Sequence, residues 1–132
     1  MIAQLLDTRV LLLFLQNDPN LPDTLAKRIE SPENRSLVSL ASLWELAQKQ
    51  SQGLVNFEAI QRPDLPSLLT EEGFEVLPIE WTTMKRASSL PPHHRDPTDR
   101  ILIAEAITRD VPILSLDPIF DRYKIQRIGT SL

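Results

Sequence analysis

The chain has 132 residues, a formal net charge of −4 and no cysteine. This length suits one domain with one hydrophobic core, which we expect to cover residues 1–132. The lack of cysteine excludes a disulfide framework and any zinc site with cysteine ligands, and it fits a cytoplasmic protein. The acidic balance argues against a broadly basic nucleic-acid-binding surface.

The apolar segments are too short for a membrane span, which needs about 20 residues. The longest covers residues 10–15 and lies between Arg9 and Gln16. The N-terminal segment also lacks the basic start of a signal peptide. We therefore expect no membrane association.

The first half of the chain alternates short apolar runs with helical patterns. We predict a strand over residues 2–6, a helix over 10–16, and a second helix that Pro22 opens and that continues over 24–30. A strand over 36–39 follows. A helix over 40–50 comes next, with Gly53 as its stop.

The second half continues the alternation. We predict helices over residues 65–72, 81–89, 98–109 and 119–123, strands over 74–79, 111–116 and 125–128, and a loop over 90–97 that is rich in proline and charge. Strands that alternate with helices form a mainly parallel sheet covered on both faces. The predicted fold class is therefore α/β, a three-layer α/β/α sandwich.

Four acidic residues occupy positions where the active sites of such sheets lie, beyond the carboxyl ends of the strands. Asp7 directly follows the first strand, and Asp117 directly follows the strand over 111–116. Glu45 lies in the second turn of a helix that follows a strand, and Asp99 lies in the first turn of the helix over 98–109. We predict that these four carboxylates converge at one edge of the sheet.

Converging carboxylates raise each other's pKa and stay ionised only with cations nearby. Ligands that are all oxygen suit Mg²⁺ or Mn²⁺. Such a centre activates a water molecule and stabilises the charge on a scissile phosphate. The arrangement therefore predicts phosphodiester hydrolysis.

Each acid also has a purely structural interpretation that the sequence leaves open. Asp7 suits the N-cap of the next helix, and Glu45 completes a capping-box pattern that starts at Ser42. Asp96 and Asp99 suit a helix N-terminus, and Asp117 with its following proline suits a turn. The functional interpretation depends on the joint placement of these acids.

Four segments carry a family resemblance. They are Leu5-Leu6-Asp7-Thr8, residues 38–47 around Glu45, residues 90–104 with the run His93-His94-Arg95-Asp96-Pro97-Thr98-Asp99-Arg100, and residues 113–120 around Asp117. They resemble the acid-bearing segments of the PIN-domain family, most closely the VapC-type toxins of bacterial toxin–antitoxin pairs. The resemblance covers nearly the whole chain, and residues 90–104 are its most specific part.

The resemblance implies an Mg²⁺- or Mn²⁺-dependent endoribonuclease that leaves a 5′-phosphate and a 3′-hydroxyl. It implies metal ligands at Asp7, Glu45, Asp99 and Asp117, with Asp96 as an auxiliary acid and Thr8 as a support. It also implies an RNA substrate, a VapB-like antitoxin that covers the acidic groove with a basic side chain, and a homodimer. The first helices and residues 12–15 are candidate contact surface. Arg9 and Leu13 depart from the branch, which has His and Trp there.

Basic and aromatic residues near the acids have open roles. Arg9, Arg95 and Arg100 are candidate substrate contacts, and each is also placed to balance a neighbouring carboxylate. We interpret His93 and His94 as solvated loop residues, because consecutive side chains point apart. For two further residues, Trp44 is expected in the core, and Trp81 at the surface or an interface.

Two other functions remain open on the sequence alone. One is a catalytically inactive protein-binding module that keeps the PIN fold. The other is a phosphatase or flap-type nuclease on a related scaffold. Metal-dependent cleavage of RNA but not DNA is the observation that separates these from the ribonuclease.

Overall fold

A five-stranded parallel sheet forms the centre of the computed structural model, which describes residues 2–129. The ends of the expected domain, residues 1 and 130–132, lie outside this range. The strand order is β3-β2-β1-β4-β5. The strands are β1 (Ile2–Leu6), β2 (Asn34–Ser39), β3 (Glu75–Leu77), β4 (Ile113–Leu114) and β5 (Arg127–Ile128).

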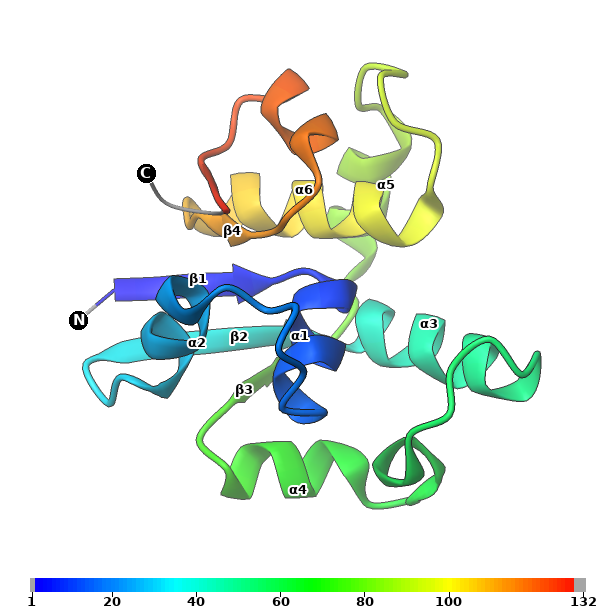
Figure 1. Ribbon diagram of the computed structural model, residues 1–132. Helices are drawn as coiled ribbons and strands as arrows, with labels where there is room; N and C mark the ends of the chain where they lie inside the picture. Colours follow the sequence, from blue (N-terminus) through cyan, green and yellow to red (C-terminus); the bar gives the residue numbers. More distant parts are fainter. Residues whose placement is uncertain (1, 130–132) are drawn as a thin grey trace.

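Within residues 2–129, six α-helices and two short 3₁₀ helices accompany these strands. They are α1 (Thr8–Leu15), α2 (Asp23–Glu30), α3 (Leu40–Ser51), η1 (Glu58–Gln61), α4 (Leu65–Glu71), α5 (Trp81–Ser88), α6 (Pro97–Arg109) and η2 (Pro118–Arg122). In the view of Figure 1, α5 and α6 lie above the strands, and α4 lies below them. Within residues 2–129, no helix has the length and apolar character that a membrane span requires.

Both faces of the sheet are buried, because consecutive strand residues point to opposite sides. Leu6 and Leu114 pack into one apolar cluster with side chains of α1, α2, α3 and α4. Their neighbours Leu5 and Ile113 pack into a second cluster with α6 and with Phe120 of η2. Helices therefore cover both faces, which confirms the predicted three-layer α/β/α sandwich.

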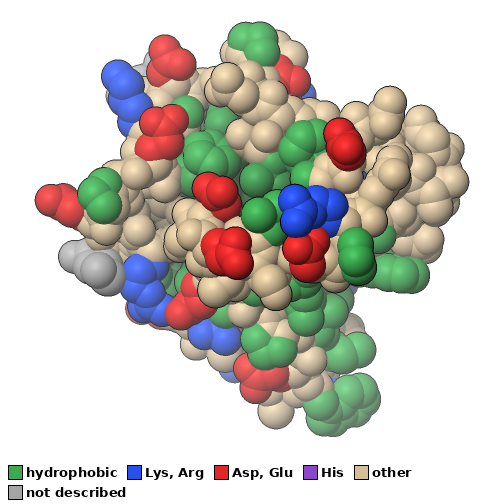
Figure 2. All heavy atoms as spheres, turned by 90° about the horizontal axis from the view of Figure 1, so that it is seen from below, with side chains coloured by type: hydrophobic (Ala, Val, Ile, Leu, Met, Phe, Trp, Pro, Cys, Tyr) green, Lys and Arg blue, Asp and Glu red, His purple; other side chains and the backbone are tan. Residues whose placement is uncertain are grey.

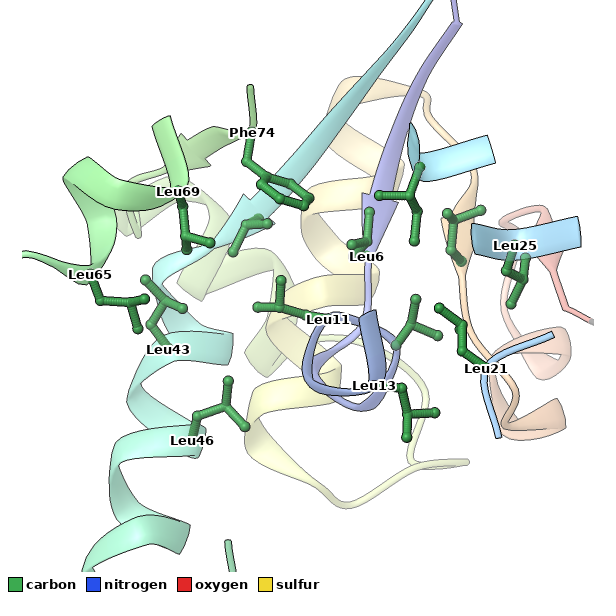
Figure 3. Packing of buried hydrophobic residues seen from close by; sticks show 14 residues of the cluster. Leu6, Leu11, Leu13, Leu21, Leu25, Leu43, Leu46, Leu65, Leu69 and Phe74 are labelled. Atoms are coloured by element: carbon green, nitrogen blue, oxygen red, sulfur yellow. The ribbon is translucent and has the colours of Figure 1, made fainter. Parts of the chain in front are cut away.

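Leucine side chains from several elements form the larger cluster (Figure 3). Leu11 of α1 lies between Leu43 and Leu46 of α3 and Leu6 of β1. Leu11 is fully buried, and each buried leucine stabilises the fold by about 1.5–3 kcal/mol. This packing fixes the start of α1 and of α3, which both carry predicted site residues.

The structure differs from the predictions in its shorter strands and in the middle of the chain. The predicted strand over residues 111–116 is reduced to Ile113–Leu114. Pro112 has no backbone N–H to donate, and Asp117 is already the N-cap of η2. The segment before α4 carries η1, which the sequence pattern does not indicate. The other strands and helices are present, with ends that differ by a few residues.

Residues 12–15 remain a candidate contact surface, in which Leu13 is buried and the other three side chains are partly exposed. Two interpretations of side chains are wrong. Trp44 is 62% exposed on α3 instead of lying in the core. The capping box at Ser42 does not form, since Ser39 caps α3 by accepting from the Ala41 N–H.

Candidate metal centre

The strand order places a crevice at the carboxyl ends of β1 and β4. From β1 the chain moves outward to β2 and β3, and then returns to the other side of β1 to form β4 and β5. At such a topological switch point the connections leave in opposite directions and open a crevice between them. Asp7 follows β1 and Asp117 follows Leu114 of β4 by three residues, so both acids belong to this crevice.

A cleft of about 450 Å³ lies at this position. Its lining includes Asp7, Glu45, Asp99 and Asp117, together with Thr8, Arg9 and Lys49. The four predicted acids, which come from four separate segments of the chain, therefore lie along one hollow. Asp96 and Arg95 are not among the residues that line it.

Asp7 is held at the end of β1 by its role as N-cap of α1. Its Oδ1 accepts a hydrogen bond from the Val10 N–H at 2.7 Å. The side chain is buried, and burial is the main reason that its pKa rises to about 6. The negative charge of Asp117 raises this pKa further. The capping interpretation is thus confirmed, and it fixes the carboxylate inside the cleft.

Asp99 lies in the first turn of α6 and has a similar environment. Burial raises its pKa to about 6, while a hydrogen bond with His94 opposes this rise. The charges of Asp96 and Asp7 add to the rise. Asp96 itself caps α6, because its Oδ1 accepts from the Asp99 N–H at 2.8 Å. The structure therefore shows Asp96 shaping the site from outside the cleft.

Glu45 reaches the cleft from α3 and pairs with Lys49 one turn later. The Lys49 Nζ lies 3.1 Å from Glu45 Oε2, while Glu45 Oε1 is buried without a hydrogen-bond partner in the described chain. A buried carboxylate oxygen without a partner is costly. Sequence reasoning did not select Lys49, although its spacing of four residues from Glu45 was a signal for an ion pair.

Thr8 joins the first and third helices beside the acids. Its Oγ1 donates a hydrogen bond to Ser42 Oγ at 3.0 Å, and both hydroxyls are buried. This contact fixes the start of α1 against α3. Thr8 follows Asp7, and Ser42 lies on the same helix as Glu45. The hydrogen bond between the two hydroxyls therefore constrains the distance between the Asp7 and Glu45 backbones.

The predicted basic residues have three different surroundings. Arg9 is exposed and lines the cleft. Arg95 is exposed outside it. The guanidinium of Arg100 donates to four backbone carbonyls, those of Ala87, Leu90, Pro91 and His94. Its Nη1 and Nη2 donors are occupied within the chain, so we infer that Arg100 has a structural role rather than a substrate contact.

His94 is the main site residue that sequence reasoning missed. Its Nε2 lies 2.7 Å from Asp99 Oδ2, and its side chain is 18% exposed, so the expectation of a solvated loop residue is wrong. The expectation that the two consecutive side chains point apart is correct, since His93 is exposed and its ring packs against that of Tyr123. The two rings separate, and only one of them reaches the acids.

The residues that line the cleft fit a divalent cation in their chemistry. Oxygen donors suit Mg²⁺ or Mn²⁺. Oε1 of Glu45 has no hydrogen-bond partner among the described residues, and burial and neighbouring acids raise the pKa values of Asp7 and Asp99, so a cation would stabilise all three carboxylates. Within residues 2–129, no three of these side chains are already arranged as a metal-binding group. Binding of a cation would therefore need these side chains to move closer together.

The family model of the PIN domain matches residues 5–126. The chain belongs to the PIN domain family. PIN domains are generally nucleases, and the match spans all four acids of the cleft. No curated protein sequence matches the chain.

Solved structures share the PIN fold with this chain. VapBC2 from Rickettsia felis bound to a promoter DNA fragment aligns with a TM-score of 0.73 and 14% identity, over 98% of this chain and 100% of that one. VapBC-1 from nontypeable Haemophilus influenzae aligns with a TM-score of 0.66 and 18% identity, over 97% of this chain and 98% of that one. The PIN domain endonuclease Utp24 aligns with a TM-score of 0.54 and 15% identity, over 98% of this chain and 86% of that one. At these identities, the likeness describes the fold.

Proposed function

We propose that this PIN domain is a metal-dependent endoribonuclease. The observation that carries the proposal is the cleft, which Asp7, Glu45, Asp99 and Asp117 line from four separate segments. Structural needs explain the caps at Asp7 and Asp117, but they do not explain why Asp7 and Asp99 lie where burial and neighbouring acids raise their pKa values. Functional sites tolerate such costs.

The four carboxylates would hold one or two Mg²⁺ or Mn²⁺ ions. A bound ion supplies the charge that activates a water molecule and stabilises the phosphate during hydrolysis. The carboxylate of Asp7 is fixed by its capping contact with the Val10 N–H, and that of Asp99 by its contact with His94 Nε2, so both offer ligands in a set position. No protein nucleophile is required by this chemistry.

Arg9 and Lys49 are the basic residues placed to bind RNA phosphates in the cleft. Both line it, and Lys49 lies against Glu45. A scissile phosphate must approach the acids, and positive side chains beside them reduce the repulsion between phosphate and carboxylates. RNA is proposed over DNA on the family resemblance, and an accessible single strand suits an open cleft.

Lys49→Met tests this role of Lys49. We expect a several-fold rise in KM for RNA, because one phosphate contact is lost. We also expect several-fold tighter Mn²⁺ binding, because a competing positive charge leaves Glu45. The matched control is Lys27→Met, which removes an exposed lysine of α2. An unchanged KM together with unchanged Mn²⁺ affinity would remove Lys49 from the proposal.

We further propose that the protein is the toxin of a toxin–antitoxin pair, because several of the solved structures that share its fold come from VapBC complexes. A second hollow of about 750 Å³ offers a surface for the antitoxin. Phe14, Leu68 and Phe74 contribute to its apolar lining, and Glu30 and Glu72 lie beside them. Figure 2 shows such an apolar hollow with acidic side chains around it.

Both hollows adjoin α1, since Leu12 lines the acidic cleft and Phe14 lines the apolar hollow. One antitoxin segment is therefore expected to span them, with apolar residues in the hollow and a basic side chain among the acids. Leu68→Arg is expected to weaken binding of the VapB-like antitoxin at least tenfold and to leave RNA cleavage unchanged. Equal antitoxin binding by this variant would exclude the hollow.

RNA cleavage by the wild type and by Asp7→Asn is the experiment that tests the proposed activity. Asparagine keeps the N-cap of α1 but removes the charge, so the variant is expected to fold and to lose at least 100-fold in rate. Asp23→Asn, on the exposed start of α2, is the matched control. Each protein is incubated with labelled RNA or DNA in Mn²⁺ or EDTA.

Cleavage of RNA in Mn²⁺, with 5′-phosphate products and no cleavage in EDTA, is the expected result. Equal cleavage by Asp7→Asn would point to a contaminant or to another site. Absence of any cleavage by the wild type, with its antitoxin bound normally, would instead favour the catalytically inactive binding module.

A further inference from the structure

The loop between α5 and α6 is held in one conformation by contacts from two other elements. The Tyr123 hydroxyl donates to the Pro91 carbonyl at 2.6 Å and accepts from the His94 N–H at 2.9 Å. Arg100 donates to the Pro91 and His94 carbonyls from the other direction. The backbone of His94 is therefore fixed on both of its polar groups.

The imidazole ring of His94 is oriented by packing. It meets the ring of Phe120 edge to face, with centroids 6.0 Å apart and planes at 86°. Phe120 is fully buried in η2, so it provides a rigid surface. With backbone and ring both restrained, the ring places Nε2 2.7 Å from Asp99 Oδ2.

The contact has a defined donor when Asp99 is ionised. A carboxylate only accepts hydrogen bonds, so Nε2 must carry the proton that lies between the two atoms. The backbone of Asp99 is also fixed, since the Asp99 N–H donates to Asp96 Oδ1. Within residues 2–129, the hydrogen bonds of the Asp99 side chain involve Oδ2 and His94 alone.

We propose that His94 is a positioning residue of the metal centre. Its Nε2–H holds Oδ2 of Asp99 and so presents this carboxylate to the cation through the remaining oxygen, Oδ1. This inference rests on the proposed function and names a residue that acts through another. Carboxylates that ligate metals are themselves held by hydrogen bonds, and the loss of such a partner lowers metal affinity or activity by about 10–100-fold.

The structure explains why a rigid loop is needed for this task. Asp99 shares the cleft with other acids, and its charge is repelled by Asp7. An unrestrained side chain would turn away from that repulsion in the absence of a cation. A donor on Oδ2 opposes the rotation, so the ligand is already oriented before the cation arrives.

The test compares variants of His94 with variants of its neighbour. His94→Phe keeps the ring against Phe120 but removes the donor, and His94→Gln restores an N–H near the position of Nε2. His93→Phe is the matched control, because His93 pairs with Tyr123 and does not line the cleft. Mn²⁺ affinity is measured by calorimetry without RNA, and kcat and KM for RNA are measured across Mn²⁺ concentrations.

We expect His94→Phe to bind Mn²⁺ about 10–100-fold more weakly, to recover kcat as Mn²⁺ is raised, and to keep the KM for RNA. His94→Gln is expected to regain most of the affinity, and His93→Phe to match the wild type within twofold. If His94→Phe fails to fold, His94→Leu, which is smaller and also lacks the donor, is expected to give the same loss.

Two results would overturn the inference, and they differ in their consequence for the proposed nuclease function. Wild-type Mn²⁺ affinity in a folded variant without the donor would exclude positioning by His94 and would leave the proposed nuclease standing. Failure of the wild type itself to bind Mn²⁺ would remove the metal-dependent function together with the role of His94.

Discussion

Single residues at the cleft perform a structural and a chemical task at once. Asp7 caps α1 through Oδ1 and lines the cleft with Asp117, whose own Oδ1 accepts from the Ile119 N–H at the start of η2. A cap lies by definition where a strand or loop turns into a helix, and that is the edge at which an α/β sheet opens its crevice. The structural and functional interpretations of these acids are therefore compatible.

The acids were predictable from the sequence because their positions follow from the order of elements. A residue directly after a strand in a parallel sheet has its edge determined by topology alone, as with Asp7. His94 and Lys49 were not predictable in this way. Their contacts depend on the path of a loop and on a side-chain rotamer, and the rotation that separates His93 from His94 comes from Tyr123 and Phe120, far along the chain.

Glu105 is a buried acid of α6 that lies outside the cleft. It is 3% exposed on α6, its Oε1 has no hydrogen-bond partner among residues 2–129, and burial raises its pKa to about 7, against the effects of Ser39 and Arg109. The folded state binds this proton more tightly than the unfolded state, whose pKa is near the ordinary 4.5. Glu105 therefore lowers the free energy of unfolding progressively as pH rises from about 4.5 to about 7, and this loss of stability is complete above pH 7.

Glu105→Gln is expected to raise the free energy of unfolding by up to about 3 kcal/mol at about pH 8, and by much less at about pH 5. The physical reason is that glutamine cannot ionise. Urea denaturation at the two pH values measures the difference, with Glu33→Gln in an exposed turn as control. A gain of the same size at both pH values would contradict this account.

At the scale of elements, α6 and the loop before it form one unit through Arg100. Its guanidinium bonds to carbonyls of α5 and of the loop, at 2.8 Å for Ala87 and for Leu90. The sequence predicted the loop and the helix but left the role of Arg100 open, because a guanidinium next to acids also suits phosphate. The structural role of Arg100 depends on how close the end of α5 lies to α6. This is a tertiary contact, which the local sequence does not show.

Arg100→Lys tests this element-level role. Lysine keeps the charge but loses the planar fork that serves several carbonyls, so we expect a loss of about 2 kcal/mol or more in the free energy of unfolding. Amide hydrogen exchange should also speed up at His94, whose N–H is bonded to Tyr123. Normal stability and exchange in the variant would show that the fork is dispensable.

At the scale of the whole molecule, exposed apolar side chains gather on α3 and on the segment that leads into α5. Leu40, Trp44, Ile79, Trp81 and Met84 are all at least 36% exposed. These segments follow β2 and β3, which pair in register at Ser39 and Leu77. We propose this surface, alongside the candidate surface at residues 12–15, as a contact of a homodimer.

Trp44→Glu with Trp81→Glu is expected to convert the homodimer to a monomer in sedimentation measurements, since charges would be buried at the contact. The variant should keep its metal centre, because neither residue lines the cleft. A wild type that sediments as a monomer at high concentration would contradict the dimer, and it would leave the nuclease proposal unaffected.

The central claim concerns the whole molecule, because four segments must fold together before any cation can bind. The most direct measurement is a crystal structure of the protein soaked in Mn²⁺, with anomalous scattering to locate the ions. We predict an anomalous peak in the cleft at coordination distance from oxygens of Asp7, Asp99 and Asp117, with Glu45 turned toward it. Well-ordered carboxylates in a soaked crystal with no peak among them would contradict the account.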